Sequence, residues 1–217
     1  HGFPGQKTAH NDLFGEIEFI LGDKGFHILR FDYRGCGESD GKEEDFTIGS
    51  ACEDFQTMLY WAKSKGYERF IYVGEGIGAA LSIMNTDLDV IGLIMLWPVL
   101  DLDVYRKSAF GISKISQSEL DKGYVEHKKR RLGVTFLKEL RKMDLGYAIR
   151  DVRMPTLILH GTQDAIVPIS QLDVARAQMN SKRLEITSFH DGEHGLPDYK
   201  HRKAMIFQIQ QFVEKYI

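Results

Sequence analysis

An alternation of apolar, strand-like runs with amphipathic, helix-like segments is the feature that most limits how this sequence can fold. Runs rich in strand-forming residues recur, and most are separated by segments in which apolar residues repeat at helical spacing. The predicted strands are 26–31, 70–73, 90–96, 156–160 and 184–189, and the predicted helices are 12–23, 47–65, 79–84, 170–179 and 199–216. Because parallel strands need long crossover connections, this order predicts an α/β fold, with a mostly parallel sheet and helices on both faces.

Composition excludes several classes of protein. With 217 residues, 43% of them hydrophobic and 27% charged, the chain has the values of a globular protein of one domain with a large insertion. The net charge of −3 gives no reason to expect nucleic acid as a partner, and no apolar run approaches the ~20 residues of a membrane span. Cys36 and Cys52 form neither a disulfide framework nor a zinc motif. We therefore expect a cytoplasmic protein without metal or cofactor.

Three loops that follow predicted strands contain the residue types of a catalytic site, where parallel α/β sheets bind their ligands. They are Gly74–Gly78, His160–Pro168 and Phe189–Pro197. The segment 70–81 around the first loop has the pattern of a nucleophile elbow, in which flanking glycines allow a sharp turn between a strand and a helix. The residue at the position of the nucleophile is Gly76.

Five motifs together resemble those of a known family. In chain order they are HGFPG at 1–5, FDYRGCGES at 31–39, the elbow at 70–81, LILHGTQDAIVP at 157–168 and GEHG at 192–195. This series resembles the α/β-hydrolase superfamily, and more narrowly its serine aminopeptidase S33-like and cinnamoyl or feruloyl esterase-like branch. The resemblance covers the chain except for its middle. It implies an α/β-hydrolase core of residues 1–100 and 151–217, with a helical cap, or lid, at 101–150.

The resemblance also implies a role for each site residue. Asp164 and His194 match the acid and the base of a catalytic triad, and the backbone N–H groups of Phe3 and Ile77 match the oxyanion hole. In such a site the histidine takes the proton of the nucleophile, the acid orients the histidine, and the N–H groups stabilise a tetrahedral intermediate. Gly76 departs from the family pattern, because glycine has no side-chain atom that can attack a carbonyl.

The sequence also allows different roles for several residues of these loops. Aspartate is common in polar turns, so Asp164 could serve the turn alone, and His190 competes with His194 for the role of the base. Glu75 and Cys36 are alternative nucleophiles. A water molecule activated by the histidine–aspartate pair is a further route to slow hydrolysis.

The start of the chain is also unusual. The sequence begins without Met, and residues 1–5 have the composition of a turn that follows a strand. In the family, the strand before this turn lies between the strands predicted here at 26–31 and 70–73. We therefore expect that the sequence lacks an N-terminal segment with that strand and any targeting signal, and that 26–31 and 70–73 do not pair directly.

The middle segment 101–150 is basic, with twelve Lys and Arg against seven Asp and Glu. We expect its run Lys128–Arg131 to be the solvated face of a helix; the alternative is that the run guides an anionic acyl substrate or an acidic carrier protein.

The sequence thus predicts a hydrolase of carboxylic esters, thioesters or amides that is inactive or strongly impaired, because Gly76 replaces the serine. The alternative is a non-catalytic pseudoenzyme that binds a small acyl or aromatic ligand. The expected partner is a small acyl or aromatic ester in the first case and such a ligand in the second. The sequence does not determine the oligomeric state.

Overall fold

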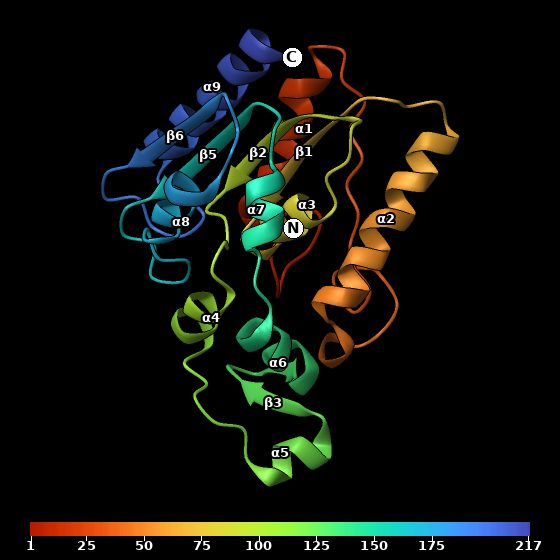
Figure 1. Cartoon of the computed structure of the whole chain (residues 1–217), viewed down its shortest axis with the longest axis vertical. Coiled ribbons are helices and arrows are strands. Elements are labelled where there is room, and N and C mark those ends of the chain that lie inside the picture. Colours follow the sequence, from red (N-terminus) through yellow and green to blue (C-terminus); the bar gives the residue numbers. More distant parts are fainter.

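The computed structural model describes all 217 residues and contains a four-stranded parallel sheet in the order β1-β2-β5-β6 (Figure 1). The strands are β1 (Phe70–Glu75), β2 (Val90–Leu96), β5 (Thr156–Gly161) and β6 (Leu184–Phe189). All three ladders are parallel, so the carboxyl ends of the four strands lie at the same edge of the sheet. The predicted α/β fold with a parallel sheet is confirmed.

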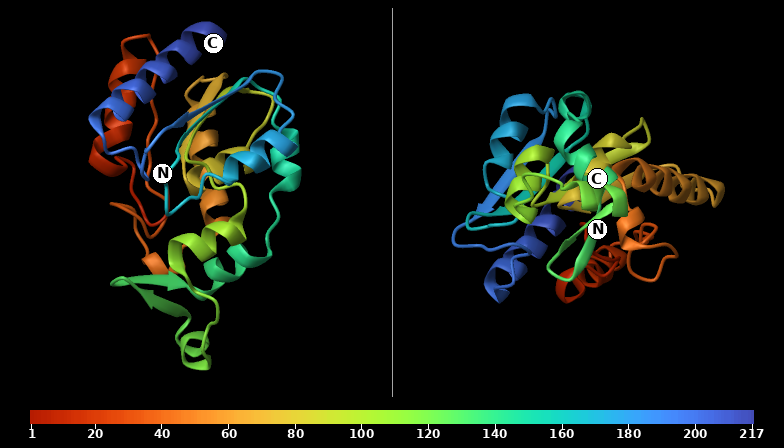
Figure 2. Two further views of the ribbon diagram at one scale, coloured as in Figure 1. Left: turned by 90° about the vertical axis from the view of Figure 1, so that its left-hand side faces the viewer. Right: turned by 90° about the horizontal axis from the view of Figure 1, so that it is seen from below.

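Helices flank this sheet on both faces (Figures 1 and 2). They are α1 (Leu13–Gly22), α2 (Ile48–Ser64), α3 (Ile77–Met84), α7 (Gly146–Asp151), α8 (Gln171–Gln178) and α9 (Tyr199–Tyr216). α1 contacts α9 on one face, whereas α3, α7 and α8 lie on the opposite side. Local capping sets where two of these helices begin. The Thr47 hydroxyl accepts a bond from the Ser50 N–H before α2, and the Asp198 carboxylate accepts bonds from two N–H groups at the start of α9.

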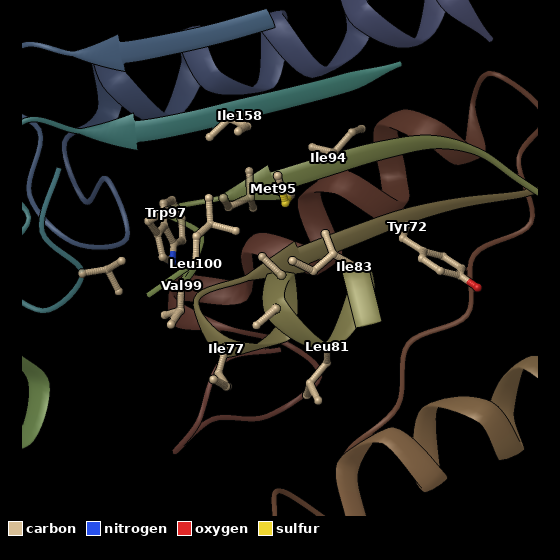
Figure 3. Close-up of a cluster of buried hydrophobic side chains, with 14 of the residues drawn as sticks. Tyr72, Ile77, Leu81, Ile83, Ile94, Met95, Trp97, Val99, Leu100 and Ile158 are labelled. Atoms are coloured by element: carbon tan, nitrogen blue, oxygen red, sulfur yellow. The ribbon is translucent and has the colours of Figure 1, made fainter. Parts of the chain in front are cut away.

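The hydrophobic core lies around the two central strands. Every residue of β5 is buried and β2 is nearly so, which explains why both strands are continuous apolar runs instead of alternating patterns. Figure 3 shows Ile83 of α3 beside the strands, in one buried cluster with Ile94 and Met95 of β2 and Ile158 of β5. This packing anchors α3, and with it the turn that precedes α3, against the sheet. No helix is both long and apolar enough to cross a membrane.

Residues 101–150, which we call the insertion, form the lower part of the molecule in Figure 1, with α7 returning to the core. The insertion contains α4 (Leu102–Tyr105), a π-helical segment (Arg106–Phe110), α5 (Gln117–Lys122), the strands β3 (Tyr124–His127) and β4 (Arg130–Gly133), α6 (Val134–Lys142) and α7. β3 and β4 pair as an antiparallel hairpin. The expectation of a wholly helical insertion is therefore wrong at 124–133.

The basic run Lys128–Arg131 belongs to this hairpin and not to a helix. Lys128 and Lys129 have positive φ angles of 46° and 64° and form the turn. Arg130 and Arg131 begin β4 and pair with Glu43 and Glu44 of a neighbouring 3-10 turn (Glu43–Asp45). Four consecutive cations have no apolar face to bury in a helix, but a hairpin turn leaves all of them exposed. The predicted exposure of the run is observed, and the predicted helix is not.

The segment 26–31 forms no strand, and β1 pairs only with β2. A cavity of about 520 Å³ has both 26–31 and 70–73 in its lining, together with apolar side chains of α1 and α2. The backbone of 27–31 makes no backbone hydrogen bonds. The strand predicted at 26–31 is thus wrong, because strand-forming residues need a neighbouring backbone to pair with. The expectation that 26–31 and 70–73 do not pair directly agrees with the structure.

Candidate active site

Asp164 and His194 form a hydrogen-bonded pair at the carboxyl edge of the sheet. Asp164 lies on the loop after β5 and His194 on the loop after β6. His194 Nδ1 lies 2.8 Å from Asp164 Oδ2. The Asp164 side chain is fully buried, whereas the His194 side chain is 34% exposed. With Nδ1 facing the carboxylate, Nε2 is the nitrogen of His194 that remains free to accept a proton.

Backbone donors hold Asp164 in place for this contact. Its Oδ1 atom accepts bonds from the N–H groups of Ile166 at 2.9 Å and Val167 at 2.8 Å. His160, at the end of β5, makes no hydrogen bond with Asp164 but lies close, with Nε2 2.7 Å from the Val167 carbonyl oxygen and 3.8 Å from Asp164 Oδ2. Burial lowers the pKa of His160 and keeps its ring neutral. Asp164 is therefore oriented by neutral groups, and His194 is its close partner.

Two glycines allow the two loops to approach each other. A Cβ atom on Gly161 would collide with the carbonyl oxygen of Gly192. The same carbonyl accepts a bond of 2.8 Å from the Gln163 N–H, so the backbones of the two loops are in direct contact. This approach places the Asp164 loop beside the His194 loop, and any side chain at position 161 would separate them.

Gly76 lies on the sharp turn between β1 and α3, with φ 53° and ψ −120°. Its N–H donates to the Leu96 carbonyl and its own carbonyl accepts from Val99, each at 3.0 Å. The turn is tight enough that a Cβ atom on Gly74 would lie 2.6 Å from the Gly78 carbonyl oxygen. A Cβ on Gly76 itself would meet only the Gly2 Cα, at 3.9 Å. There is space for a side chain at position 76, but the positive φ favours glycine.

Two backbone N–H groups near this turn have no hydrogen-bond partner. Ile77 is the first residue of α3, so its N–H lies before the first intrahelical bond. The Phe3 N–H also donates no bond within the chain. Phe3 follows Gly2, the neighbour of Gly76, and its ring is buried against Phe46 at a centroid distance of 4.0 Å. The two N–H groups are thus available to an oxygen atom bound beside Gly76.

Trp97 connects the turn to the histidine. It follows β2 with an unusual φ of 36° and is 1% exposed. Its ring packs edge-on against the ring of His194 at 5.7 Å, while the backbone on either side of it bonds Gly76. Residues 96–99 therefore contact both Gly76 and His194 and hold them at the same edge of the sheet. None of the sequence motifs includes Trp97, although an aromatic residue directly after a predicted buried strand is a signal for a position at the site.

Comparison with known proteins identifies this architecture. The family model described as alpha/beta hydrolase fold matches residues 1–84. The structure of Est1E from Butyrivibrio proteoclasticus with bound ferulic acid superposes with a TM-score of 0.84, at 21% identity over 100% of this chain and 86% of that chain. Mouse ABHD10 superposes with a TM-score of 0.80, at 22% identity over 99% of this chain and 87% of that chain. The chain has the α/β-hydrolase fold.

Sequence relatives agree with this assignment. The chain is 26% identical to human protein ABHD12B over 90% of its own length and 54% of that protein. It is 25% identical to the mitochondrial palmitoyl-protein thioesterase ABHD10 of Mus musculus, over 92% of its own length and 69% of the relative. The chain spans about half the length of ABHD12B and about two thirds of ABHD10.

Of the two candidate histidines, His190 and His194, only His194 contacts Asp164. His190 Nδ1 pairs instead with the neighbouring Asp191 at 2.7 Å, and its side chain is 89% exposed. No cluster of three or more metal-ligating side chains is present.

The two alternative nucleophiles are poorly placed for attack. Burial raises the pKa of the Cys36 thiol to about 12, so the thiolate is scarce at neutral pH. The Glu75 carboxylate accepts the N–H of Gly2 at 3.2 Å and thereby supports the loop that contains Phe3. Glu75 thus has a structural partner, and Cys36 has no histidine as a hydrogen-bond partner to activate it.

Proposed function

We propose that this chain belongs to the α/β-hydrolase superfamily and has the machinery of a serine hydrolase for carboxylic esters, thioesters or amides. Glycine takes the nucleophile position, so the protein is inactive or strongly impaired as it stands. The observation that supports this most directly is the 2.8 Å contact between His194 and Asp164 at the sheet edge where Gly76 forms the turn. An acid–base pair of this geometry serves to remove a proton from a nucleophile.

Each remaining group has a defined role in that chemistry. With a hydroxyl at position 76, His194 Nε2 would take its proton as the oxygen attacks the carbonyl carbon, and Asp164 would stabilise the resulting imidazolium. The N–H groups of Phe3 and Ile77 would hold the negative charge on the carbonyl oxygen. With glycine, substrate binding and charge stabilisation remain, and only a water molecule is left as the attacking group.

The proposed substrate is a small acyl or aromatic ester, and both the packing of the insertion and the relatives support this proposal. Aromatic side chains of the insertion, Phe110 and Phe136, pack next to each other, and Phe136 lies 4.9 Å from the Phe3 ring. These buried rings join the insertion to the loop of Phe3, and we propose that the insertion acts as a lid over a small acyl or aromatic group. The bound ferulic acid of Est1E and the thioesterase name of ABHD10 are both acyl chemistry.

A second candidate function is binding without catalysis. The observation that favours it is the φ of 53° at Gly76, which glycine adopts without the strain that serine would have there. The loss of the nucleophile therefore relaxes the turn, and a protein that only binds an acyl or aromatic ligand gains stability from it.

Restoration of the nucleophile tests the proposal. Gly76→Ser, the parent chain and Gly76→Ala are compared on p-nitrophenyl esters and acyl thioesters, after circular dichroism has shown that each is folded. Gly76→Ala adds the Cβ without the hydroxyl and is the matched control. We expect turnover by Gly76→Ser well above both others, and its loss when His194→Ala is added. If folded Gly76→Ser shows no more turnover than Gly76→Ala, while ferulic acid raises the melting temperature of the parent, the result contradicts the hydrolase proposal and supports the binding function.

A further inference from the structure

A second cleft, of about 290 Å³, lies in the insertion, and neither Asp164 nor His194 lines it. Five of its ten lining residues are cationic and none is acidic. The cations are Arg106, Lys114, Lys138, Arg141 and Lys142. Its remaining wall is mostly aliphatic, with Ile112, Ile115 and Leu137 among the contributors. The cleft therefore combines a concentrated positive charge with an apolar surface.

One of these cations is part of the wall. The buried guanidinium of Arg106 bonds Asp103 Oδ1 through Nε at 2.8 Å and through Nη2 at 2.6 Å, and its Nη1 bonds the Ile112 carbonyl. Lys107 pairs with the other oxygen of Asp103 at 2.6 Å. Hydrogen bonds from Lys107 and Arg106 lower the pKa of Asp103 and keep it ionised. Both carboxylate oxygens of Asp103 are thus paired with Arg106 and Lys107, and Asp103 forms no ion pair with the other cations of the cleft.

The other four cations have no carboxylate partner, although acidic residues are close in the sequence. Lys138, Arg141 and Lys142 stand at i, i+3 and i+4 on one face of α6. Glu139 is turned to the start of α2, where it accepts the Ile48 N–H at 2.7 Å. Asp144 accepts the Gly146 N–H at 2.9 Å instead. The charges of this helix are separated by face, and the face toward the cleft is wholly positive.

Lys138 and Lys142 repel each other at this helical spacing, and the dipole at the C-terminal turn of α6 offsets part of the repulsion. An anion in the cleft reverses the sign of the interaction, and Arg and Lys together are suited to phosphate oxygens. Inorganic phosphate alone would leave the aliphatic wall uncovered. An organic phosphate with a short apolar group satisfies both parts of the cleft.

We propose that the cleft between α6 and residues 106–115 binds a small organic phosphate, with the phosphate on Lys114, Lys138 and Arg141 and its apolar group on the aliphatic wall. The site is independent of the proposed hydrolase chemistry. A soluble phosphate ester and a phospholipid headgroup share this chemistry, and the experiment separates them.

Calorimetric titration of the full chain at low ionic strength tests the site with three probes. They are pyrophosphate, isopentenyl diphosphate, and phosphatidylcholine vesicles that contain phosphatidic acid. We expect isopentenyl diphosphate to bind more tightly than pyrophosphate. The double variant Lys138→Gln/Arg141→Gln should weaken it by about tenfold or more, because it removes two charge-assisted contacts.

The matched control is Lys128→Gln/Lys129→Gln, which removes the same charge from the same insertion at exposed turn residues that do not line the cleft. It should keep the affinity of the parent. Equal losses in the two double variants, or no binding of any probe, would overturn the proposal, and so would equal affinity for pyrophosphate and isopentenyl diphosphate. Binding to vesicles alone, abolished by Lys138→Gln/Arg141→Gln only, supports the site and identifies a lipid headgroup as the source of the phosphate.

Discussion

The hydroxyl of Tyr105 donates a hydrogen bond of 2.8 Å to the carbonyl oxygen of Phe3. Tyr105 belongs to α4 in the insertion. Phe3 lies in the N-terminal loop, and its N–H group has no hydrogen-bond partner. Both residues are buried, at 4% exposure each. The insertion therefore holds the proposed oxyanion loop directly, beyond any role it has as a cover.

This contact predicts an effect of Tyr105→Phe on catalysis. In the Gly76→Ser background, we expect kcat to fall about tenfold with little change in KM, because the Phe3 N–H acts on charge that develops in the transition state. Steady-state kinetics on a p-nitrophenyl ester measures both constants. The matched control is Tyr72→Phe, which removes another mostly buried hydroxyl, 3.3 Å from the Asn85 carbonyl and distant in the chain from the loop. Equal kcat losses in the two variants would reduce Tyr105 to a purely structural role.

The orientation of His194 by Asp164 gives a second prediction. Asp164→Asn in the Gly76→Ser background should lower kcat by roughly 10⁴-fold. The N–H groups of Ile166 and Val167 keep the amide oxygen at the Oδ1 position, so the amide nitrogen replaces Oδ2 and cannot accept Nδ1–H, which favours the wrong tautomer. Circular dichroism establishes that the variant is folded. His190→Gln serves as the control, since His190 is exposed and pairs only with Asp191. A loss of similar size in His190→Gln would contradict the assignment of the base to His194.

The close approach of the two site loops predicts an unequal effect of two glycine substitutions. Gly161→Ala should lower the free energy of unfolding by about 1–3 kcal/mol or more, because its Cβ collides with the Gly192 carbonyl. Gly22→Ala is the control, since Gly22 in α1 has no neighbour within 4 Å and alanine favours helix by up to ~1 kcal/mol. Urea unfolding measures both. The loop contact would be unimportant if Gly161→Ala were as stable as the parent.

Burial of His160 predicts a dependence of stability on pH. Its pKa in the folded protein is lowered from the usual value near 6.5, so the unfolded chain binds a proton first as the pH falls. The contribution of His160 to stability is complete above about pH 6.5 and decreases below it. Urea unfolding at a series of pH values should show this decrease. The decrease in the free energy of unfolding should be smaller in His160→Gln, because glutamine does not ionise. An equal decrease in the parent and in His160→Gln would exclude His160 as the cause.

The sequence predicted most of the core well. The bounds expected for β6 and α9 agree with the structure, and those of β2 do as well. These segments have strong local patterns, namely a continuous apolar run for a buried strand and a helical repeat of apolar residues. The roles of Asp164 and His194 were predicted from the resemblance of the motifs at 157–168 and 192–195 to those of a family, and the structure brings the two side chains into contact.

The elements that the sequence did not predict depend on contacts between distant segments. The hairpin at 124–133 is stabilised by pairs such as Arg130 with Glu43, which are far apart in the chain. The segment 26–31 has the composition of a strand but no neighbouring backbone to pair with. Tyr105 and Trp97 gained their places at the site from the folding of α4 and of the bend after β2.

By itself, the sequence determined the alternation of strands and helices and the glycine at the turn before α3. These follow from local preferences, since hydrophobic period and turn chemistry act over a few residues. Only the tertiary structure decided that His194 instead of His190 meets Asp164, that Tyr105 holds Phe3, and that four unpaired cations converge on one cleft. Hydrogen bonds and charge pairs act over a few ångströms, so they depend on which distant residues the packed core brings together.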